Sequence, residues 1–282
     1  MSLLTAFANS KLLRSPLLAA SRLMLRPLHS GPKLLRRAAY DAMPVPYLVV
    51  GGRELFVVST ADRVIGRELF LSGEFDFRKL QLALEIIDRE GASRPVHLID
   101  VGANVGSIVI PALKRGLVQT ATAIEPHPDN LRMLRANLSL NQLQEFVRVI
   151  AVAVGDGDSS ELMLKESETN GGNHCISEKG IPVLSASLDS LDLPLDSALL
   201  WMDIEGYEGH ALDGAASLLA RRVPIVAEFN PGYLAASGGL GAFYRHLRDR
   251  RIFNLADSTG KEISLEELAH LYQGTFTDVL AL

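Results

Sequence analysis

Acidic residues follow three apolar runs of the sequence, each at the point where a buried strand is expected to end. Asp100 lies near the end of run 96–101, Glu125 follows run 121–124, and Asp156 follows run 147–154. Ligands of open parallel sheets bind outside the carboxyl ends of the strands, so these side chains are expected on one rim. A carboxylate beside a glycine turn suits a cationic or amino-bearing ligand, and Glu125 stands where a carboxylate accepts hydrogen bonds from both ribose hydroxyls.

These features together fit S-adenosylmethionine, with Asp156 placed to meet the adenine amino group. Each acidic residue taken singly is also explained as a helix or turn cap. The loop after the first strand reads DVGANVG from Asp100 to Gly106, and Asn104 occupies the place of the middle glycine in a dinucleotide fingerprint. The sequence therefore disfavours a pyrophosphate ligand, and it contains no P-loop, nucleophile-elbow or zincin motif.

Strands and helices alternate through most of the chain, which is typical of a parallel sheet with helices on both faces. We expect an α/β fold with a Rossmann-like, doubly wound sheet, preceded by a β-hairpin and a helix. The hairpin is predicted at 45–50 and 53–58 around a Gly-Gly turn, and the helix at 75–89. Further strands are predicted at 96–101, 121–124, 147–154, 198–204, 224–229, 252–255 and 277–282, and further helices at 105–113, 128–137, 209–219 and 243–251.

The first 40 residues carry seven basic and no acidic side chains, whereas the whole chain has 28 basic and 33 acidic residues and a net charge of −5. This leader is interpreted as a membrane-surface helix (15–26), an organellar transit peptide or a solvated extension. The net charge disfavours nucleic-acid binding, and the single cysteine favours a reducing, cytoplasmic location, with membrane association or organellar import as alternatives. The expected parts are a leader at 1–40, the hairpin and helix at 41–95, and the catalytic domain at 96–282.

Five segments resemble, in order and spacing, the FkbM family of class I methyltransferases, which use S-adenosylmethionine. The segments are DVGANVG (100–106), AIEPHP (123–128), Asn137 with Asn141, AVAVGD (151–156) and MDIEGYE (202–208). The resemblance covers about 96–228 and implies a seven-stranded sheet with a reversed last hairpin. It also implies methyl transfer to a hydroxyl of a sugar, polyketide or lipid-linked metabolite.

The resemblance assigns roles to individual residues. The methionine end of the cofactor would lie at Asp100, Gly102, Asn104 and Gly106, the ribose at Glu125, and the adenine near Ala153 and Asp156. Asp203 would border both the cofactor and the methyl-transfer site, with Glu205 beside it. The chain departs from the family at Met202, where many members have lysine.

Methyl transfer to oxygen needs a base, and clustered carboxylates raise one another's proton affinity. The candidate bases are Asp203, Glu205 and Glu228, with Asp203 or Glu205 favoured; the alternative is that Glu205 and Glu208 only fix the turn and the next helix. His127 is expected to be an exposed helix-entry residue, and His174-Cys175 is not expected to bind a metal. The glycine-rich segment 165–180 is interpreted as a lid, an acceptor-binding element or a plain loop. Two other functions stay open: a noncatalytic cofactor-binding or membrane-associated scaffold, and a nicotinamide-dependent oxidoreductase.

Overall fold

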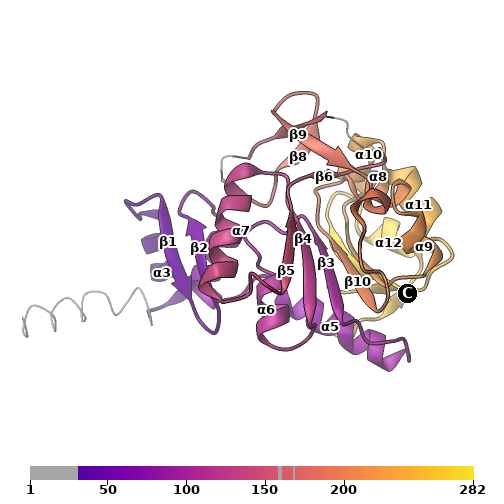
Figure 1. The fold of residues 1–282 in the computed structure, drawn as a ribbon, viewed down its shortest axis with the longest axis horizontal. Coiled ribbons are helices and arrows are strands. Elements are labelled where there is room, and N and C mark those ends of the chain that lie inside the picture. Colours follow the sequence, from indigo (N-terminus) through magenta and orange to yellow (C-terminus); the bar gives the residue numbers. More distant parts are fainter. Residues whose placement is uncertain (1–30, 158–160, 168) are drawn as a thin grey trace, which may run out of the picture. The chain divides into compact units, whose positions relative to one another are not determined.

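The computed structural model describes residues 31–157, 161–167 and 169–282 (Figure 1). The chain divides into two compact units, 1–46 and 47–282. In the first unit the described residues form one helix, α3 (Lys33–Asp41), on which Leu34 and Leu35 are exposed. The helix predicted at 15–26 lies outside the described residues.

An eight-stranded sheet forms the centre of the second unit, in the order β13-β12-β14-β11-β10-β3-β4-β5. Strands β3, β4, β5, β10 and β11 run parallel to one another, whereas β14 is antiparallel to both β11 and β12. The doubly wound, Rossmann-like fold and its reversed last hairpin are therefore confirmed. The eighth strand is the two-residue β13 at the edge, which the sequence does not predict. The strands are β3 (His97–Val101), β4 (Thr120–Ile124), β5 (Val147–Ile150), β10 (Ala198–Met202), β11 (Ile225–Phe229), β12 (Ile252–Asn254), β13 (Glu262–Ile263) and β14 (Thr277–Ala281).

Helices cover both faces of this sheet, which explains why its central strands are almost uniformly apolar. Figure 1 shows α5, α6 and α7 on one side and α8, α9, α11 and α12 on the other. Alternate strand residues, among them Val101, Met202 and Ala227, pack with the second group of helices in one large apolar cluster. Met202 therefore contributes to packing. The helices are α4 (Ile65–Ser72), α5 (Phe77–Arg89), α6 (Val109–Lys114), α7 (Pro128–Leu140), α8 (Glu208–Asp213), α9 (Ala216–Ala220), α10 (Pro231–Ser237), α11 (Leu240–Leu247) and α12 (Leu265–Leu271), with a short 3-10 helix, η1 (Leu188–Leu191).

The predicted hairpin is present as β1 (Tyr47–Gly51) and β2 (Leu55–Ser59). Two amide side chains of α7 and its C-cap attach β2 to this helix. The Asn137 Oδ1 accepts from the Val57 N–H at 2.5 Å, and the Asn141 Oδ1 accepts from the Leu55 N–H at 3.1 Å. Asn137 is fully buried, and an unpaired amide at a buried position is costly, so its bond to Val57 stabilises the attachment.

A second sheet of four short strands lies beyond the carboxyl ends of the central strands, in the order β6-β9-β7-β8. The strand predicted at 147–154 is wrong as a single element, because the chain leaves the main sheet after Ile150 and β6 pairs with β9 instead. The strands are β6 (Ala153–Val154), β7 (Glu161–Lys165), β8 (Cys175–Ser177) and β9 (Ile181–Ala186). This small sheet carries the predicted glycine-rich segment and places it above the rim (Figure 1).

Two further sequence expectations need correction. The helix predicted at 209–219 is two helices, α8 and α9, because the chain turns at Gly214, where a Cβ would collide with the Gly155 carbonyl. Helices α3, α4, α10 and α12 are not anticipated from the sequence pattern. Across the described ranges, no helix combines the length and the apolar character needed to span a bilayer.

Candidate active site

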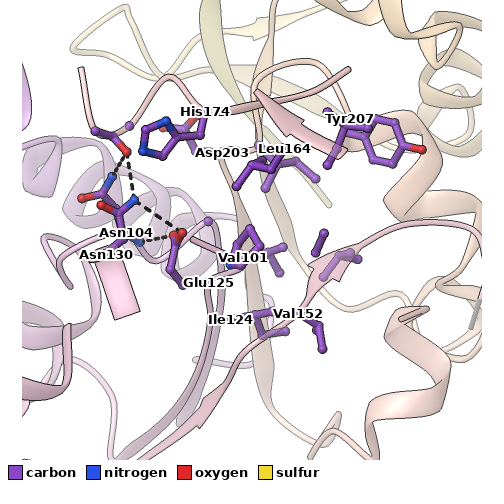
Figure 2. Close-up of a pocket in the computed structure, with 18 residues that line it drawn as sticks. Val101, Asn104, Ile124, Glu125, Asn130, Val152, Leu164, His174, Asp203 and Tyr207 are labelled. Carbon is purple, nitrogen blue, oxygen red and sulfur yellow. Dashed lines mark hydrogen bonds between the residues drawn. The ribbon is translucent and has the colours of Figure 1, made fainter. Parts of the chain in front are cut away.

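A cavity of about 50 Å³, the central pocket, lies at the carboxyl ends of β3, β4 and β10. Its floor is apolar and comes from the ends of these strands and from the segment that links β5 to β6. Figure 2 shows Val101, Ile124 and Val152 on this floor, with Leu164, His174 and Tyr207 on the opposite side. The second group comes from the small sheet and from the turn after β10, so two separate layers of the fold enclose the pocket.

Glu125 is the acidic side chain at the centre of the polar wall, and it is buried. Its two oxygens accept from backbone amides, Oε2 from the Asn104 N–H and Oε1 from the His127 N–H, both at 2.8 Å. Burial raises the pKa of Glu125, and these two hydrogen bonds oppose that rise. The Asn130 Nδ2 also donates to Oε1, at 3.4 Å. The carboxylate is thereby held in one orientation, and Oε2 keeps a second lone pair for a ligand.

The glycine-rich segment between β7 and β8 closes over this wall. The Gly171 carbonyl accepts from the Asn104 Nδ2 at 2.6 Å and from the Asn130 Nδ2 at 2.9 Å (Figure 2). A third bond runs from the Arg63 N–H to the Thr169 carbonyl at 2.7 Å. Gly171 and Gly172 line the central pocket. The segment therefore covers the pocket, and two amide side chains of the rim fasten it. Its residues 169–174 are called the lid below.

His127 is the N-cap residue of α7, as expected for a helix-entry residue, but it is buried, so the expectation that it is exposed is wrong. Its Nε2 lies 2.9 Å from Glu166 Oε1, and its ring lies 4.2 Å from the ring of His174 between centroids. Burial, together with the neighbouring His127, lowers the pKa of His174 to about 4, so this imidazole is neutral at pH 7. The described residues contain no group of three or more side chains arranged to hold a metal ion.

Several carboxyl groups gather at the ends of β10 and β11. Burial and the charges of Glu205 and Asp278 raise the pKa of Asp203 well above its usual value. Burial and Asp203 raise the pKa of Glu228 to about 10, and burial and Glu208 raise that of Glu205 to about 7. Nearby negative charges and low exposure act in the same direction here, because both penalise ionisation.

Glu208 and Glu205 have different surroundings. The Glu208 Oε1 accepts from the Ile204 N–H at 3.0 Å, and the Glu208 side chain is completely buried. Glu208 therefore fixes the turn before α8. Glu205 is only partly buried, and it lines a second, larger cavity, the outer cleft, which lies between the small sheet and α10.

The structure brings some of the predicted site residues to the central pocket and leaves others outside it. Those that line it are Gly102, Asn104, Glu125, Ala153 and Asp203. Those that do not are Asp100, Gly106, Asp156, Glu205 and Glu228. Gly106 packs against side chains of α6 and α7, Asp156 is an exposed residue near His210, and Glu228 interacts electrostatically with Asp203.

Asp100 lines a small neighbouring cavity that shares Gly102, Asn104 and Asp203 with the central pocket. Its Oδ2 is buried and has no hydrogen-bond partner among the described residues. Burial, together with the charge of Glu125, raises the pKa of Asp100 to about 7. A buried acceptor without a donor is costly, so this position is suited to a ligand that brings an N–H or a positive charge.

Most other residues that line the pocket are not predicted as site residues from the sequence, among them Asn130, Leu164, Ile176 and Tyr207. Leu164 and Ile176 belong to strands β7 and β8, whose return over the rim no local pattern reveals. Tyr207 lies inside the MDIEGYE segment, and its place in that motif could have identified it as a site residue.

The sequence model of the FkbM methyltransferase domain matches residues 100–249. None of the curated proteins compared with the chain matches it significantly. Among solved structures, an FkbM methyltransferase from Methylobacillus flagellatus is 15% identical with a TM-score of 0.46, over 77% of this chain and 52% of the other. The chain thus spans about half the length of that protein.

Two further solved structures are similar to this chain at a comparable sequence identity. TYW2 from M. jannaschii, solved in complex with AdoMet, is 14% identical with a TM-score of 0.45, over 85% of each chain. A precorrin-6y C5,15-methyltransferase from Geobacter metallireducens is 14% identical with a TM-score of 0.39, over 73% of this chain and 86% of the other. These likenesses concern the fold.

The residues of the central pocket fit S-adenosylmethionine, the cofactor of the matched family. Asp100 Oδ2, which is unpartnered and lies in the small cavity next to this pocket, would face the positively charged methionine end. Glu125 would accept from the ribose hydroxyls, and the apolar floor would hold the adenine. Pockets for such molecules measure roughly 300–1,000 Å³, which is larger than the central pocket of about 50 Å³ with residues 169–174 in this position. The family match covers more than half of the chain. The chain belongs to the FkbM methyltransferase family.

Proposed function

We propose that the chain is an O-methyltransferase that acts on a hydroxyl of a sugar, polyketide or lipid-linked metabolite, with Glu205 as the general base. When bound, S-adenosylmethionine supplies an electrophilic methyl group on a sulfonium. The new carbon–oxygen bond forms as the carbon–sulfur bond breaks, the electron pair stays on sulfur, and the hydroxyl proton passes to a base. The proposal therefore depends on a carboxylate that is ionised and that reaches the acceptor.

The single observation that carries the assignment is the position of Glu205. Its carboxyl lines the open outer cleft, and its pKa is raised to about 7, so a large fraction is ionised at neutral pH and still basic. Glu228 is a poor base, since a pKa of about 10 leaves it protonated at pH 7. Asp203 lines the central pocket and is the alternative base, or a residue that positions the cofactor.

The test is methyl transfer as a function of pH in the wild-type chain and in two variants. A base with a pKa near 7 predicts that kcat/KM rises with pH and reaches a plateau above about 7. Glu205→Gln is expected to lower kcat by about 10² to 10⁴ and to leave S-adenosylhomocysteine affinity unchanged. If Asp203→Asn has that effect instead, Asp203 is the base; if it abolishes cofactor binding, Asp203 is a binding residue.

Calorimetry separates this function from the two others that the sequence left open. Titration with S-adenosylhomocysteine is expected to give micromolar-range binding, and titration with NADH none. Binding of NADH alone would favour an oxidoreductase. Binding of S-adenosylhomocysteine without methyl transfer to any hydroxyl acceptor would favour a noncatalytic cofactor-binding protein.

A further inference from the structure

The outer cleft lies directly beside the central pocket. The two cavities share Ile176 and Tyr207 as lining residues, and Glu205 stands on the cleft wall. The cleft has a volume of about 580 Å³ and is open to solvent. Small-molecule sites commonly occupy about 300–1,000 Å³, so a ligand of one to three rings fits here without any movement of the chain.

One wall of the cleft is built from the turn after β10 and from α10, and several contacts hold these two segments together. Gly206 has φ +93° and a Cβ there would collide with Tyr233, so only glycine allows the turn to lie against α10. The Ser237 Oγ donates to the Gly206 carbonyl at 2.7 Å, and the His210 Nε2 donates to the Ser237 carbonyl at 2.9 Å.

This wall presents two tyrosines to the cleft, Tyr207 and Tyr233. The Tyr207 ring stacks on His210 with 4.3 Å between centroids, which fixes its orientation. Burial raises the pKa of Tyr207, so its hydroxyl keeps its proton at neutral pH. Tyr233 is 43% exposed. Tyrosine rings provide flat faces for the C–H surface of a sugar ring and for a cation.

The charged residues of the cleft are three glutamates and one lysine: Glu166, Glu178, Glu205 and Lys165. Carboxylates accept hydrogen bonds from hydroxyl and ammonium groups, and they repel phosphates, sulfates and carboxylates. Serine hydroxyls at 167, 177 and 237 add further donors and acceptors. The lining is thus suited to a ligand rich in hydroxyl groups, and its charge favours a cation.

We propose that the outer cleft is the acceptor site and that the acceptor is a polyhydroxylated compound carrying an ammonium group, such as an amino sugar or an aminocyclitol. This inference rests on the proposed function, because it places the reacting hydroxyl against Glu205. The ammonium group lies among the remaining glutamates and the tyrosine faces.

Cys175, the only cysteine of the chain, lines the cleft. Its rate of labelling by charged reagents therefore measures the charge of the cleft, even though the acceptor is not identified. The full-length protein is treated with two methanethiosulfonates of similar size, one with a trimethylammonium group and one with a sulfonate. The ratio of the cationic to the anionic labelling rate is measured in the folded protein and divided by the ratio in urea-unfolded protein. This corrected ratio is expected to be about ten. Equal rates, or faster reaction of the sulfonate, would overturn the proposal.

Matched variants locate the effect. Glu178→Lys is expected to remove most of the preference for the cationic reagent, because it replaces one negative charge of the cleft by a positive one. Glu145→Lys makes the same change of net charge at an exposed residue that lies outside this cleft, and it is expected to leave the preference unchanged. Equal effects of both variants would mean that net charge, and not the cleft, selects the reagent, which would overturn the proposal.

Protection of Cys175 tests the ligand class. Trisaccharides of glucosamine, N-acetylglucosamine and galacturonate are cationic, neutral and anionic at pH 7 and are similar in size. Only the glucosamine trisaccharide is expected to slow the labelling. Tyr233→Ala is expected to abolish this protection. Phe276→Ala, a change at another exposed aromatic residue, is expected to leave the protection unchanged. No protection by the cationic trisaccharide, or better protection by the anionic one, would refute the ligand class.

The failure of this inference is distinguishable from the failure of the proposed function. If the cationic and anionic reagents label Cys175 equally fast in a protein that binds S-adenosylhomocysteine and transfers methyl groups, only the acceptor class is refuted. Cation-selective labelling in a protein that neither binds S-adenosylhomocysteine nor transfers methyl groups would refute the proposed function, and with it the acceptor role of the cleft, but not the preference of the cleft for cations.

Discussion

Gly102 lies against the backbone carbonyl of Asp203, so close that a Cβ on residue 102 would overlap the oxygen. Gly102 also has φ +84°, a conformation that side-chain-bearing residues seldom adopt. The first residue of the glycine loop after β3 is therefore in contact with the first residue of the turn after β10. Because both residues line the central pocket, this contact fixes the distance between the two motifs that form the site.

Gly102→Ala is expected to destabilise the chain strongly and to weaken cofactor binding, because the Asp203 turn must move to make room. Gly116→Ala is the matched control, since Gly116 also has a positive φ, +69°, but a Cβ there meets nothing within 4 Å. The control is expected to cost about 1 kcal/mol, and Gly102→Ala at least ~2 kcal/mol more. Urea unfolding of the two variants provides the measurement, and equal losses would show that backbone strain alone explains both glycines.

Asn130 fastens the lid, and its removal is expected to loosen it. Asn130→Ala deletes the 2.9 Å bond to the Gly171 carbonyl and the longer, 3.4 Å bond to Glu125 Oε1, but it leaves the bond from Asn104 to Gly171 in place. We expect faster amide hydrogen exchange in 169–174 and faster association and dissociation of S-adenosylhomocysteine, because the lid opens more often. Hydrogen exchange by mass spectrometry and stopped-flow binding measure the two effects. Unchanged exchange in this segment, despite the lost bond, would show that Asn130 does not hold the lid.

The central sheet was largely predictable because its strands carry a strong local signal. Strands β3, β10 and β11 are completely buried on both faces and read as short apolar runs between turns. The acidic residues at their ends followed from the rule that ligands bind at that rim. The prediction of Glu125, Asn104 and Asp203 at one pocket needed only the order of these strands and the family resemblance of their motifs.

The upper half of the site was not predictable, because tertiary pairing forms it. Leu164 and Ile176 reach the pocket only because β7 pairs with both β8 and β9, and strand registers of this kind leave little trace in a polar sequence. The burial of His127 likewise depends on Glu166 and His174, which follow it by 39 and 47 positions in the sequence. Local motifs therefore predicted the residues at the strand ends, whereas the residues contributed by the small sheet could be placed only from the three-dimensional structure.

The basic leader is expected to bind anionic membranes. Its seven basic residues and its leucines form a charge and hydrophobic pattern that suits an acidic lipid surface, and α3 presents exposed leucines at 34 and 35. The full-length chain is expected to sediment with vesicles containing phosphatidylserine and to be released by high salt, whereas a chain that starts at Ala39 stays in solution. If both chains stay in solution, membrane attachment through the leader is refuted.

The buried carboxyl of Glu208 makes the stability of the chain depend on pH. Burial raises its pKa to about 7 from an ordinary value of 4.5, so the folded state binds this proton more tightly than the unfolded state. The corresponding stability is fully present below pH 4.5 and is lost as pH rises through about 7. A tenfold change in a proton-binding constant corresponds to about 1.4 kcal/mol, so the loss is on the order of 3 kcal/mol.

Glu208→Gln tests this dependence, because glutamine keeps an oxygen for the Ile204 N–H but does not ionise. Urea unfolding between pH 5 and 8 is expected to show a shallower fall of the free energy of unfolding in this variant than in the wild-type chain. A residual slope of the same sign is expected, since the pKa values of Asp100 and Glu205 are also raised to about 7. Glu145→Gln, a change at an exposed carboxyl, is the control. Parallel curves for the wild type and Glu208→Gln would show that Glu208 is not the group whose ionisation destabilises the fold.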